Sequence, residues 1–260
     1  MTQLPSRWSS RIIDTQRVKF LLSAAAGHFS STRMRCPQCG ARDWTHISSK
    51  KVVMRLVCCH QCQLRFRIPQ DPEKHHFDFY QTAYTSSLAT KCPSEEELKK
   101  LLANGFKKTE KNFSKKIEIL KVLGVDDGSR ILDYGASWGY GTWQFNQAGF
   151  DASGFEISVP RAEYARKMLN VQVEDDLDKL QGTFDVFLSV HVLEHLPKPT
   201  VAFDLARRFL RPGGLFVAYT PNGSEACRRA NPKRYHESWG RLHPLYLDDA
   251  FYRSQLPDQP

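Results

Sequence analysis

The 260 residues suffice for one substantial α/β domain and a small additional module, and a hydrophobic fraction of 41% is ordinary for a protein with a buried core. No segment approaches the roughly 20 consecutive apolar residues of a membrane-spanning helix, which argues against an integral membrane protein. The net charge of +9 belongs to residues 1–68, which hold 12 Lys or Arg and two acids, because the remainder holds 25 basic and 26 acidic residues.

The basic N-terminal segment has two interpretations. Clustered positive charge can bind nucleic acid or an anionic surface. The simpler interpretation, which we prefer, is solvated charge on a small module and a loose tail. Residues 1–33 are rich in Arg and Ser. We expect them to be a disordered extension, a targeting-like peptide or the result of a translation start placed ahead of Met34.

Five of the seven cysteines lie within 27 positions, as two C-x-x-C pairs and one additional thiol. Without a convincing export signal, this spacing indicates metal ligation and not disulfides. We therefore predict a zinc ribbon over residues 34–69, with a structural Zn²⁺ because four thiolates leave no open position for a substrate. Cys58 could replace its neighbour only with poorer spacing. The expected ligands, with 19 residues between the pairs, are Cys36, Cys39, Cys59 and Cys62.

Residues 51–57, between the cysteine pairs, are rich in β-branched side chains and predict a strand. Residues 70–125 are expected to be an aromatic linker and helices. Ser94 and Glu97 form a capping box at the start of one helix, and a second helix over about 106–123 is expected to end at Gly124. The remaining residues, 126–260, are expected to form a single catalytic domain.

From Arg130 the pattern alternates between strands and helices, which predicts a parallel sheet with helices on both faces. Strands are expected at 130–134, 151–156, 171–174, 184–190 and 214–220. Helices are expected at about 139–148, 159–168 and 199–210.

The first of these strands runs into a glycine-rich turn, Asp133-Tyr134-Gly135-Ala136-Ser137-Trp138-Gly139. Glycines let the backbone turn sharply and approach a ligand without a Cβ in the way. The spacing does not fit the G-x-G-x-x-G fingerprint of dinucleotide-binding folds. It resembles motif I of the class I methyltransferases, D/E-x-G-x-G-x-G, with Ser137 in place of the middle glycine.

Three later segments carry the same resemblance. The second strand ends in Glu156, about 20 residues after the turn, where a carboxylate can accept hydrogen bonds from ribose hydroxyls. Residues 184–197 and 210–217 are similar to the family's segments around the fourth strand and before the fifth. The chain resembles a bacterial branch of class I S-adenosylmethionine-dependent methyltransferases that carries an N-terminal zinc ribbon and whose substrates are mostly unassigned.

The resemblance implies a Rossmann-like sheet and S-adenosyl-L-methionine as the cofactor. Asp175 follows the third strand, where the family often contacts the adenine amino group. The cofactor-binding residues implied in this way are Asp133, Gly135, Ala136, Ser137, Gly139, Glu156, Asp175 and Ser189.

Two histidines follow the fourth strand, at the carboxyl edge where open α/β sheets bind ligands. Methyl transfer to a hydroxyl needs a base near neutral pKa, and His195 is the first candidate, with His191 closer to the cofactor. The alternative is that His195 only hydrogen-bonds a loop. Residues 191–195 also match the H-x-x-E-H zinc-protease pattern, but that chemistry needs one helix carrying both histidines, and here an apolar strand precedes them and Pro197 follows.

The C-terminal residues predict an incomplete sheet. The family's sheet has seven strands, the last two forming a hairpin beyond the fifth. After Thr220 the chain offers a polar, aromatic loop, a helix near residues 247–255, and two prolines in the last five residues, which are unsuited to a central strand. We therefore expect the strand order 3-2-1-4-5 without the hairpin. In the loop, His236, Trp239, Arg241 and His243 are candidates for acceptor contact.

The leading hypothesis is a cytoplasmic O-methyltransferase acting on a carbohydrate or a small-molecule hydroxyl. A second is methylation of RNA or protein, with the basic ribbon as the docking surface. A third, of a different class, is a zinc-ribbon binding protein with a degenerate methyltransferase domain.

Overall fold

The computed structural model describes residues 18–72, 91–241 and 243–255. Most of the aromatic stretch (73–90) and the first 17 residues of the expected extension lie outside these ranges. The chain divides into two compact units, one formed by residues 76–220 and the other by residues 1–75 together with 221–260. We call them the sheet unit and the ribbon unit.

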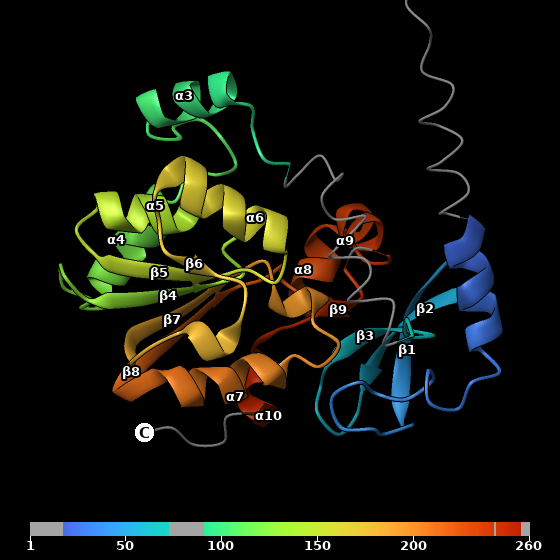
Figure 1. Cartoon of the computed structure of the whole chain (residues 1–260). Coiled ribbons are helices and arrows are strands. Elements are labelled where there is room, and N and C mark those ends of the chain that lie inside the picture. Colours follow the sequence, from blue (N-terminus) through green and yellow to red (C-terminus); the bar gives the residue numbers. More distant parts are fainter. Residues whose placement is uncertain (1–17, 73–90, 242, 256–260) are drawn as a thin grey trace, which may run out of the picture. The chain divides into compact units, whose positions relative to one another are not determined.

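The sheet unit contains a five-stranded parallel sheet in the order β6-β5-β4-β7-β8. In sequence order this is 3-2-1-4-5, as expected. Figure 1 shows α5 and α6 on one face of the sheet and α7 on the other. The strands are β4 (Arg130–Tyr134), β5 (Asp151–Phe155), β6 (Val173–Glu174), β7 (Phe184–Val190) and β8 (Leu210–Tyr219).

The first described helix of the sheet unit, α3 (Glu95–Ala103), begins where its capping signal places it. Ser94 N donates to Glu97 Oε2 at 2.8 Å and Glu97 N to Ser94 Oγ at 3.3 Å, which is the expected capping box of α3. Gly124, with φ +79°, follows the end of the second helix, α4, as expected. Helix α4 begins at Ser114, eight residues later than expected. The helices are α3 (Glu95–Ala103), α4 (Ser114–Val122), α5 (Tyr140–Gln147), α6 (Val159–Tyr164), continued by a π-helical turn (Ala165–Leu169), and α7 (Thr200–Phe209).

Central strands of the sheet are buried because helices cover both faces. Ile131, Val186 and Leu188 have no exposed surface and pack with aromatic residues of α5 and the following loop, Phe145 and Phe150. The register pairs Leu132 with Phe187 and Tyr134 with Ser189. The strand ends that carry the candidate site residues therefore lie level with one another.

The ribbon unit is built on an antiparallel sheet in the order β1-β2-β3-β9. Residues 51–57 were expected to be a strand, but Lys51 and Val52 have φ of 54° and 64° and turn the chain between β1 and β2. The polar β1 was not predicted, since it lacks a run of apolar residues. The strands are β1 (Trp44–Lys50), β2 (Met54–Cys59), β3 (Arg65–Ile68) and β9 (Leu245–Tyr246).

The end of the chain does not extend the parallel sheet. Among the described residues, β8 pairs with β7 alone, and β9 pairs with β3, where Phe66 lies opposite Leu245. The described residues give the expected five-strand order and contain no hairpin beyond β8. The single domain expected over 126–260 differs from the compact units, because residues after Thr220 fold with the ribbon. Helices α8 (Glu225–Ala230), α9 (Pro232–Ser238) and α10 (Asp249–Gln255) belong to this part.

An aromatic cluster explains why these distant segments fold together. Trp239 and Tyr246 are 1% and 2% exposed and pack against Leu56 of β2. Phe20 and Ala24 join the same cluster from a helix over residues 18–27, part of the region expected to be an extension. The sequence signal for this helix is only one short apolar run, and tertiary packing supplies the rest.

A buried ion pair provides a test of the ribbon unit. Arg65 on β3 pairs with Asp248, whose side chain is 5% exposed and also accepts from the Phe251 amide at 3.1 Å at the start of α10. Asp248→Ala leaves the Arg65 charge unpaired and removes the helix cap, so we expect a loss of about 3–5 kcal/mol of unfolding free energy. Unfolding in urea, monitored by hydrogen exchange of the β3 amides, measures this loss of free energy. The control is Asp249→Ala, since Asp249 is 78% exposed; equal midpoints for the two variants would contradict the expectation.

Candidate functional site

The glycine-rich turn joins β4 to α5 in a conformation that only glycine tolerates easily. Gly135 and Gly139 have φ of +85° and +80°, and Ser137 between them has φ 53°. A Cβ on Gly135 would lie 2.3 Å from Val192 Cγ2. The Gly135 and Ala136 amides both donate to Phe155 O, at 2.8 and 2.9 Å. The turn is therefore fastened to the end of β5.

Glu156 holds the same turn from the other side. Its side chain is 3% exposed, Oε2 accepts from the Ser137 amide at 2.8 Å, and Oε1 accepts from the Ser158 amide at 2.8 Å. Burial raises the pKa of this carboxyl, opposed by the two amides and by the Arg161 charge. Each oxygen can accept a further hydrogen bond. The geometry accommodates a diol as a second partner.

Asp133 and two serines complete the polar groups at this edge. Asp133 Oδ2 accepts from Thr142 Oγ1 at 3.0 Å, and burial raises the pKa of Asp133 to about 6. The buried hydroxyls of Ser137 and Ser189 have no hydrogen-bond partner among the residues that the structure describes. Buried polar atoms normally have partners, so these hydroxyls mark places for a ligand or water. The residues present thus fit a nucleoside cofactor.

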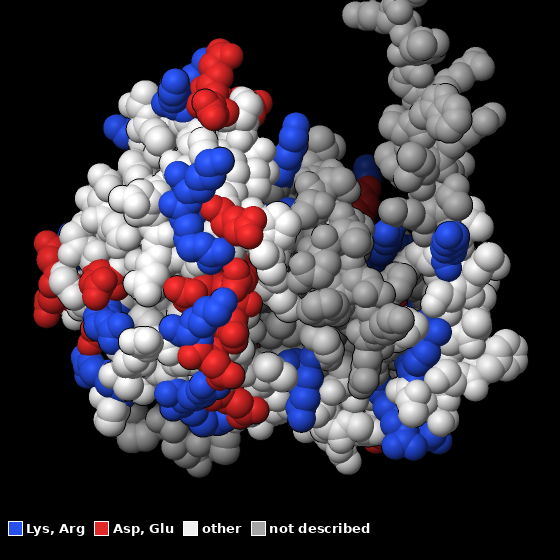
Figure 2. All heavy atoms as spheres, viewed as in Figure 1, with Lys and Arg blue, Asp and Glu red and all other residues white. Residues whose placement is uncertain are grey.

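Asp175 has other partners. Its two carboxylate oxygens pair with Arg166 Nη2 at 3.1 Å and Lys179 Nζ at 3.0 Å, and the hydrogen bond from Lys179 lowers its pKa. Figure 2 shows a band on the visible face of the molecule where basic and acidic side chains lie side by side. These pairs account for the Asp175 side chain without a ligand.

Glu194 is a site residue that the sequence analysis did not single out. It is fully buried, and its Oε1 lies 3.1 Å from His191 Nδ1 and 4.0 Å from His195 Nε2. The His191 side chain is 62% exposed and that of His195 26% exposed. His191 directly follows β7, and His195 lies in a 3₁₀ turn (Leu193–His195). This differs from the single helix that an H-x-x-E-H protease requires.

Lys116 of α4 was also missed, because no sequence pattern links it to the site. Its ammonium lies 4.3 Å from the centre of the Phe113 ring and 5.4 Å from that of Tyr219. Burial lowers the pKa of Lys116, opposed by the charge of Asp133. The lysine therefore brings a positive charge near the carboxyl ends of β4 and β8.

The four thiols predicted as metal ligands gather in the ribbon unit. The sulfur atoms of Cys36, Cys39, Cys59 and Cys62 lie within 4.8 Å of one another, with two contacts of 3.5 Å. Tetrahedral zinc with bonds of about 2.3 Å separates its sulfur ligands by about 3.8 Å, so the cluster fits the metal. Contact with Cys62 lowers the pKa of Cys36 to about 6, and the same contact raises that of Cys62. The additional thiol, Cys58, lies near Cys59 O and Gln63 O.

The C-terminal candidates for acceptor contact have structural partners within the ribbon unit. His236 Nδ1 lies 2.8 Å from Ser48 Oγ, and His243 Nδ1 lies 2.9 Å from Ser238 O. Trp239 is buried, with Lys50 over its ring at 4.7 Å. Arg241 lies 5.7 Å from the Phe20 ring. Each of the four residues thus has a contact within the ribbon unit, and their contact with an acceptor stays a prediction.

A parallel sheet in this order, with a glycine turn after its first strand and a buried carboxylate after its second, defines a Rossmann-like nucleotide-binding domain. A model of the family described as a methyltransferase domain matches residues 95–252. The chain therefore belongs to this methyltransferase-domain family, and its class is that of the S-adenosylmethionine-dependent methyltransferases.

Two curated relatives give the level of similarity. The ubiquinone biosynthesis O-methyltransferase of Alkalilimnicola ehrlichii is 28% identical over 151 residues, which cover 50% of this chain and 61% of that protein. The demethylmenaquinone methyltransferase of Tropheryma whipplei is 28% identical over 134 residues, 49% of this chain and 53% of that protein. The chain thus spans somewhat more than half the length of the relatives it matches.

A solved structure is similar at a lower level. The magnesium protoporphyrin IX methyltransferase of Synechocystis PCC 6803, with bound SAH, aligns with a TM-score of 0.49 at 14% identity. The alignment covers 70% of this chain and 86% of that one. Likeness this remote carries neither a ligand nor a substrate to the present chain.

Proposed function

We propose that the protein transfers a methyl group from S-adenosyl-L-methionine to a hydroxyl group of a small molecule or carbohydrate. The observation that carries the proposal is the buried Glu156 carboxylate, bonded to the Ser137 amide at 2.8 Å and able to accept two ribose hydroxyls. Around it, Asp133, Gly135, Ala136, Gly139 and Ser189 would line the cofactor pocket. Oxygen as the acceptor atom is supported by the name of the Alkalilimnicola relative.

When bound, the cofactor would supply a methyl group carried on a sulfonium sulfur. After transfer, this sulfur would be the thioether of S-adenosylhomocysteine. The role of the protein residues is to hold the acceptor oxygen in line with the methyl carbon and to exclude water. We propose that His195 Nε2 accepts the proton of the acceptor hydroxyl. Glu194 would orient the histidines and stabilise the charge that His195 gains, since its Oε1 lies 4.0 Å away.

An adenine amino group bound by Asp175 would share a carboxylate oxygen with Arg166 or Lys179, because both oxygens are paired with these side chains. The zinc would be structural and would hold the ribbon unit together. We place the protein in the cytoplasm, where free thiols stay reduced. Within the described residues, no helix has the length and apolar character to cross a membrane.

Replacing Glu156 tests the ribose assignment. Glu156→Ala is expected to weaken S-adenosylmethionine binding by about 1–3 kcal/mol, the scale of lost hydrogen bonds to a charged group. Calorimetry gives the dissociation constant, and thermal unfolding shows whether the turn stays folded. Glu163→Ala, on the exposed side of α6, is the matched control. An unchanged dissociation constant for Glu156→Ala would refute the assignment.

The acceptor class is tested by tritium transfer from labelled cofactor into fractionated cell extract. We expect label in a small-molecule or carbohydrate fraction that resists nuclease. The basic charge of residues 1–68 favours the second candidate, an RNA or protein acceptor docked on the ribbon. Nuclease- or protease-sensitive label would replace the first proposal with the second.

A further inference from the structure

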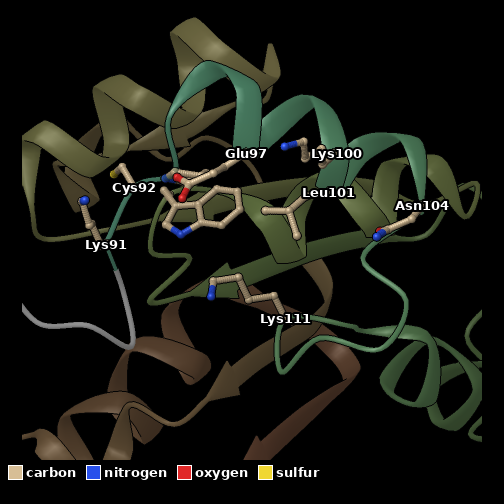
Figure 3. A pocket seen from close by; sticks show the side chains of 9 residues that line it. Lys91, Cys92, Glu97, Lys100, Leu101, Asn104 and Lys111 are labelled. Carbon is tan, nitrogen blue, oxygen red and sulfur yellow. The ribbon is translucent and has the colours of Figure 1, made fainter.

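A separate cavity in the sheet unit has no role in the proposed chemistry described so far. It has a volume of about 400 Å³, within the usual size range of small-molecule sites. It lies between α3, the segment before α4 and the residue after Ser137 in the glycine turn. Figure 3 shows Lys100 and Leu101 on α3 and Asn104 just after its end, with Lys111 approaching from the opposite side. The lining residues are Lys91, Cys92, Pro93, Glu97, Lys100, Leu101, Asn104, Lys111 and Trp138.

The polar groups that face this cavity are mainly donors without partners. Among the described residues, the ammonium groups of Lys91 and Lys111 form no ion pair or hydrogen bond, although the charge of Lys91 acts on the lining Glu97 carboxylate. The buried Nε1–H of Trp138 also lacks an acceptor within the described ranges. The third lysine, Lys100, is paired with Glu96 at 2.7 Å and is therefore not counted among the unpaired donors. A ligand that satisfies these donors must be rich in acceptors.

Glu97 is the lining group that carries negative charge, because hydrogen bonds from Ser94 and the charges of Lys91 and Lys100 lower its pKa. Glu97 accepts from the Ser94 amide at 2.8 Å in the capping box, so its carboxylate is engaged at the helix start. Burial raises the pKa of the Cys92 thiol, which keeps it neutral at pH 7. The cavity therefore presents net positive charge beside the apolar surfaces of Leu101 and Trp138.

Each wall of the cavity is anchored. Lys111 O accepts from Gln144 Nε2 of α5 at 2.9 Å, which fixes the backbone of the lysine. On the other side, Tyr164 Oη donates to Pro93 O at 2.8 Å. The Trp138 ring is held between Tyr140 and Tyr164, with centroids 4.9 and 6.0 Å away. These contacts hold the backbone and the indole ring that form the walls before a ligand arrives, which lowers the entropic cost of binding.

The cavity also lies close to the proposed cofactor site. Trp138 directly follows Ser137, whose amide binds Glu156. The charges of Glu156 and Arg161 act on the Cys92 thiol, which places that lining residue near the same carboxylate. We propose that this cavity binds the anionic group, a carboxylate or phosphate on an apolar body, of the methyl acceptor. The link to the acceptor rests on the proposed methyl transfer, whereas the anion site itself does not.

Binding is tested with phenyl phosphate and benzoate as probes and benzyl alcohol as the neutral match, measured by calorimetry on the full chain. We expect both anions to bind and the alcohol to bind at least tenfold more weakly. Lys111→Gln and Lys91→Gln should each weaken phenyl phosphate by about tenfold, the scale of a lost charge-assisted hydrogen bond. Lys99→Gln, on α3 and outside the lining, should not. Equal binding of anions and alcohol, or unchanged affinity in Lys111→Gln and Lys91→Gln, would overturn the anion site.

The acceptor assignment has a second readout. The tritiated product from cell extract is passed over an anion exchanger at pH 7, where we expect it to be retained until salt elutes it. A product that flows through unretained would overturn the assignment. S-adenosylmethionine binding is measured in parallel on the same variants. Absence of any labelled product, with phenyl phosphate still bound, would contradict the proposed methyl transfer and leave the anion site supported.

Discussion

Loss of the metal from the four-cysteine cluster is expected to release the C-terminal part of the chain along with the ribbon. The cluster anchors β2, which pairs with β3, and β3 pairs with β9. Ser254 Oγ of α10 donates to Cys62 O at 2.8 Å, so the last helix also depends on the cluster. Structural zinc contributes about 10–16 kcal/mol in small zinc modules at pH 7, more than a typical domain's whole stability.

Hydrogen exchange with and without a chelator measures this effect. We expect residues 221–255 and β3 to lose protection while β4 and β7 keep theirs, since the parallel sheet has its own core. Cys39→Ser should reproduce the chelator's effect. Cys58→Ser is the matched control, because Cys58 is outside the cluster, and it should retain the metal. Full protection of 221–255 in chelator, or full metal content in Cys39→Ser, would contradict the account.

His195→Ala is expected to lower turnover by about 10²–10⁴-fold, the usual contribution of a general base. Its ring is 26% exposed, and Nε2 lies 4.0 Å from the buried Glu194 carboxylate. Since His195 is assigned to the acceptor proton and not to the cofactor, S-adenosylmethionine affinity should stay nearly constant.

Tritium transfer into extract measures the turnover, and calorimetry measures the affinity. The control is His60→Ala, in the ribbon unit, where His60 pairs with Asp43 at 3.0 Å. A rate for His195→Ala within about twofold of the parent would instead point to catalysis by proximity alone.

The parts of the fold that the sequence predicts well are those with strong local signals. The strands around Ile131 and Val186 are short, mainly apolar segments, and Ser94 with Glu97 gives a capping box that needs no tertiary help. The missing hairpin could be predicted for a similar reason, since prolines exclude a central strand. Where local chemistry is decisive, the sequence suffices.

Other features depend on contacts between residues far apart in the chain. The polar β1 and the two-residue β9 carry almost no strand signal, and β9 exists because Leu245 pairs with Phe66. The helix over 18–27 is stabilised by Phe20 and Ala24 in a cluster with Trp239. These pairings fix the division into two units, which a linear pattern cannot reveal.

The candidate site shows the same division. Glu156 could be found from its distance to the glycine turn, and it is bonded to that turn in the structure. Glu194 had a signal, a carboxylate between two histidines in H-x-x-E-H, but its complete burial depends on the fold. Lys116 had none, because only folding brings it near Asp133.

The central claim is that the sheet unit binds S-adenosylmethionine at the glycine turn. Calorimetric titration of the full chain with S-adenosylmethionine tests it most directly, with Glu156→Ala titrated alongside. We predict a saturable heat with one site per chain for the parent and clearly weaker binding for the variant. An absence of heat in the folded, zinc-loaded parent would contradict the claim and would favour a zinc-ribbon binding protein whose methyltransferase domain is degenerate.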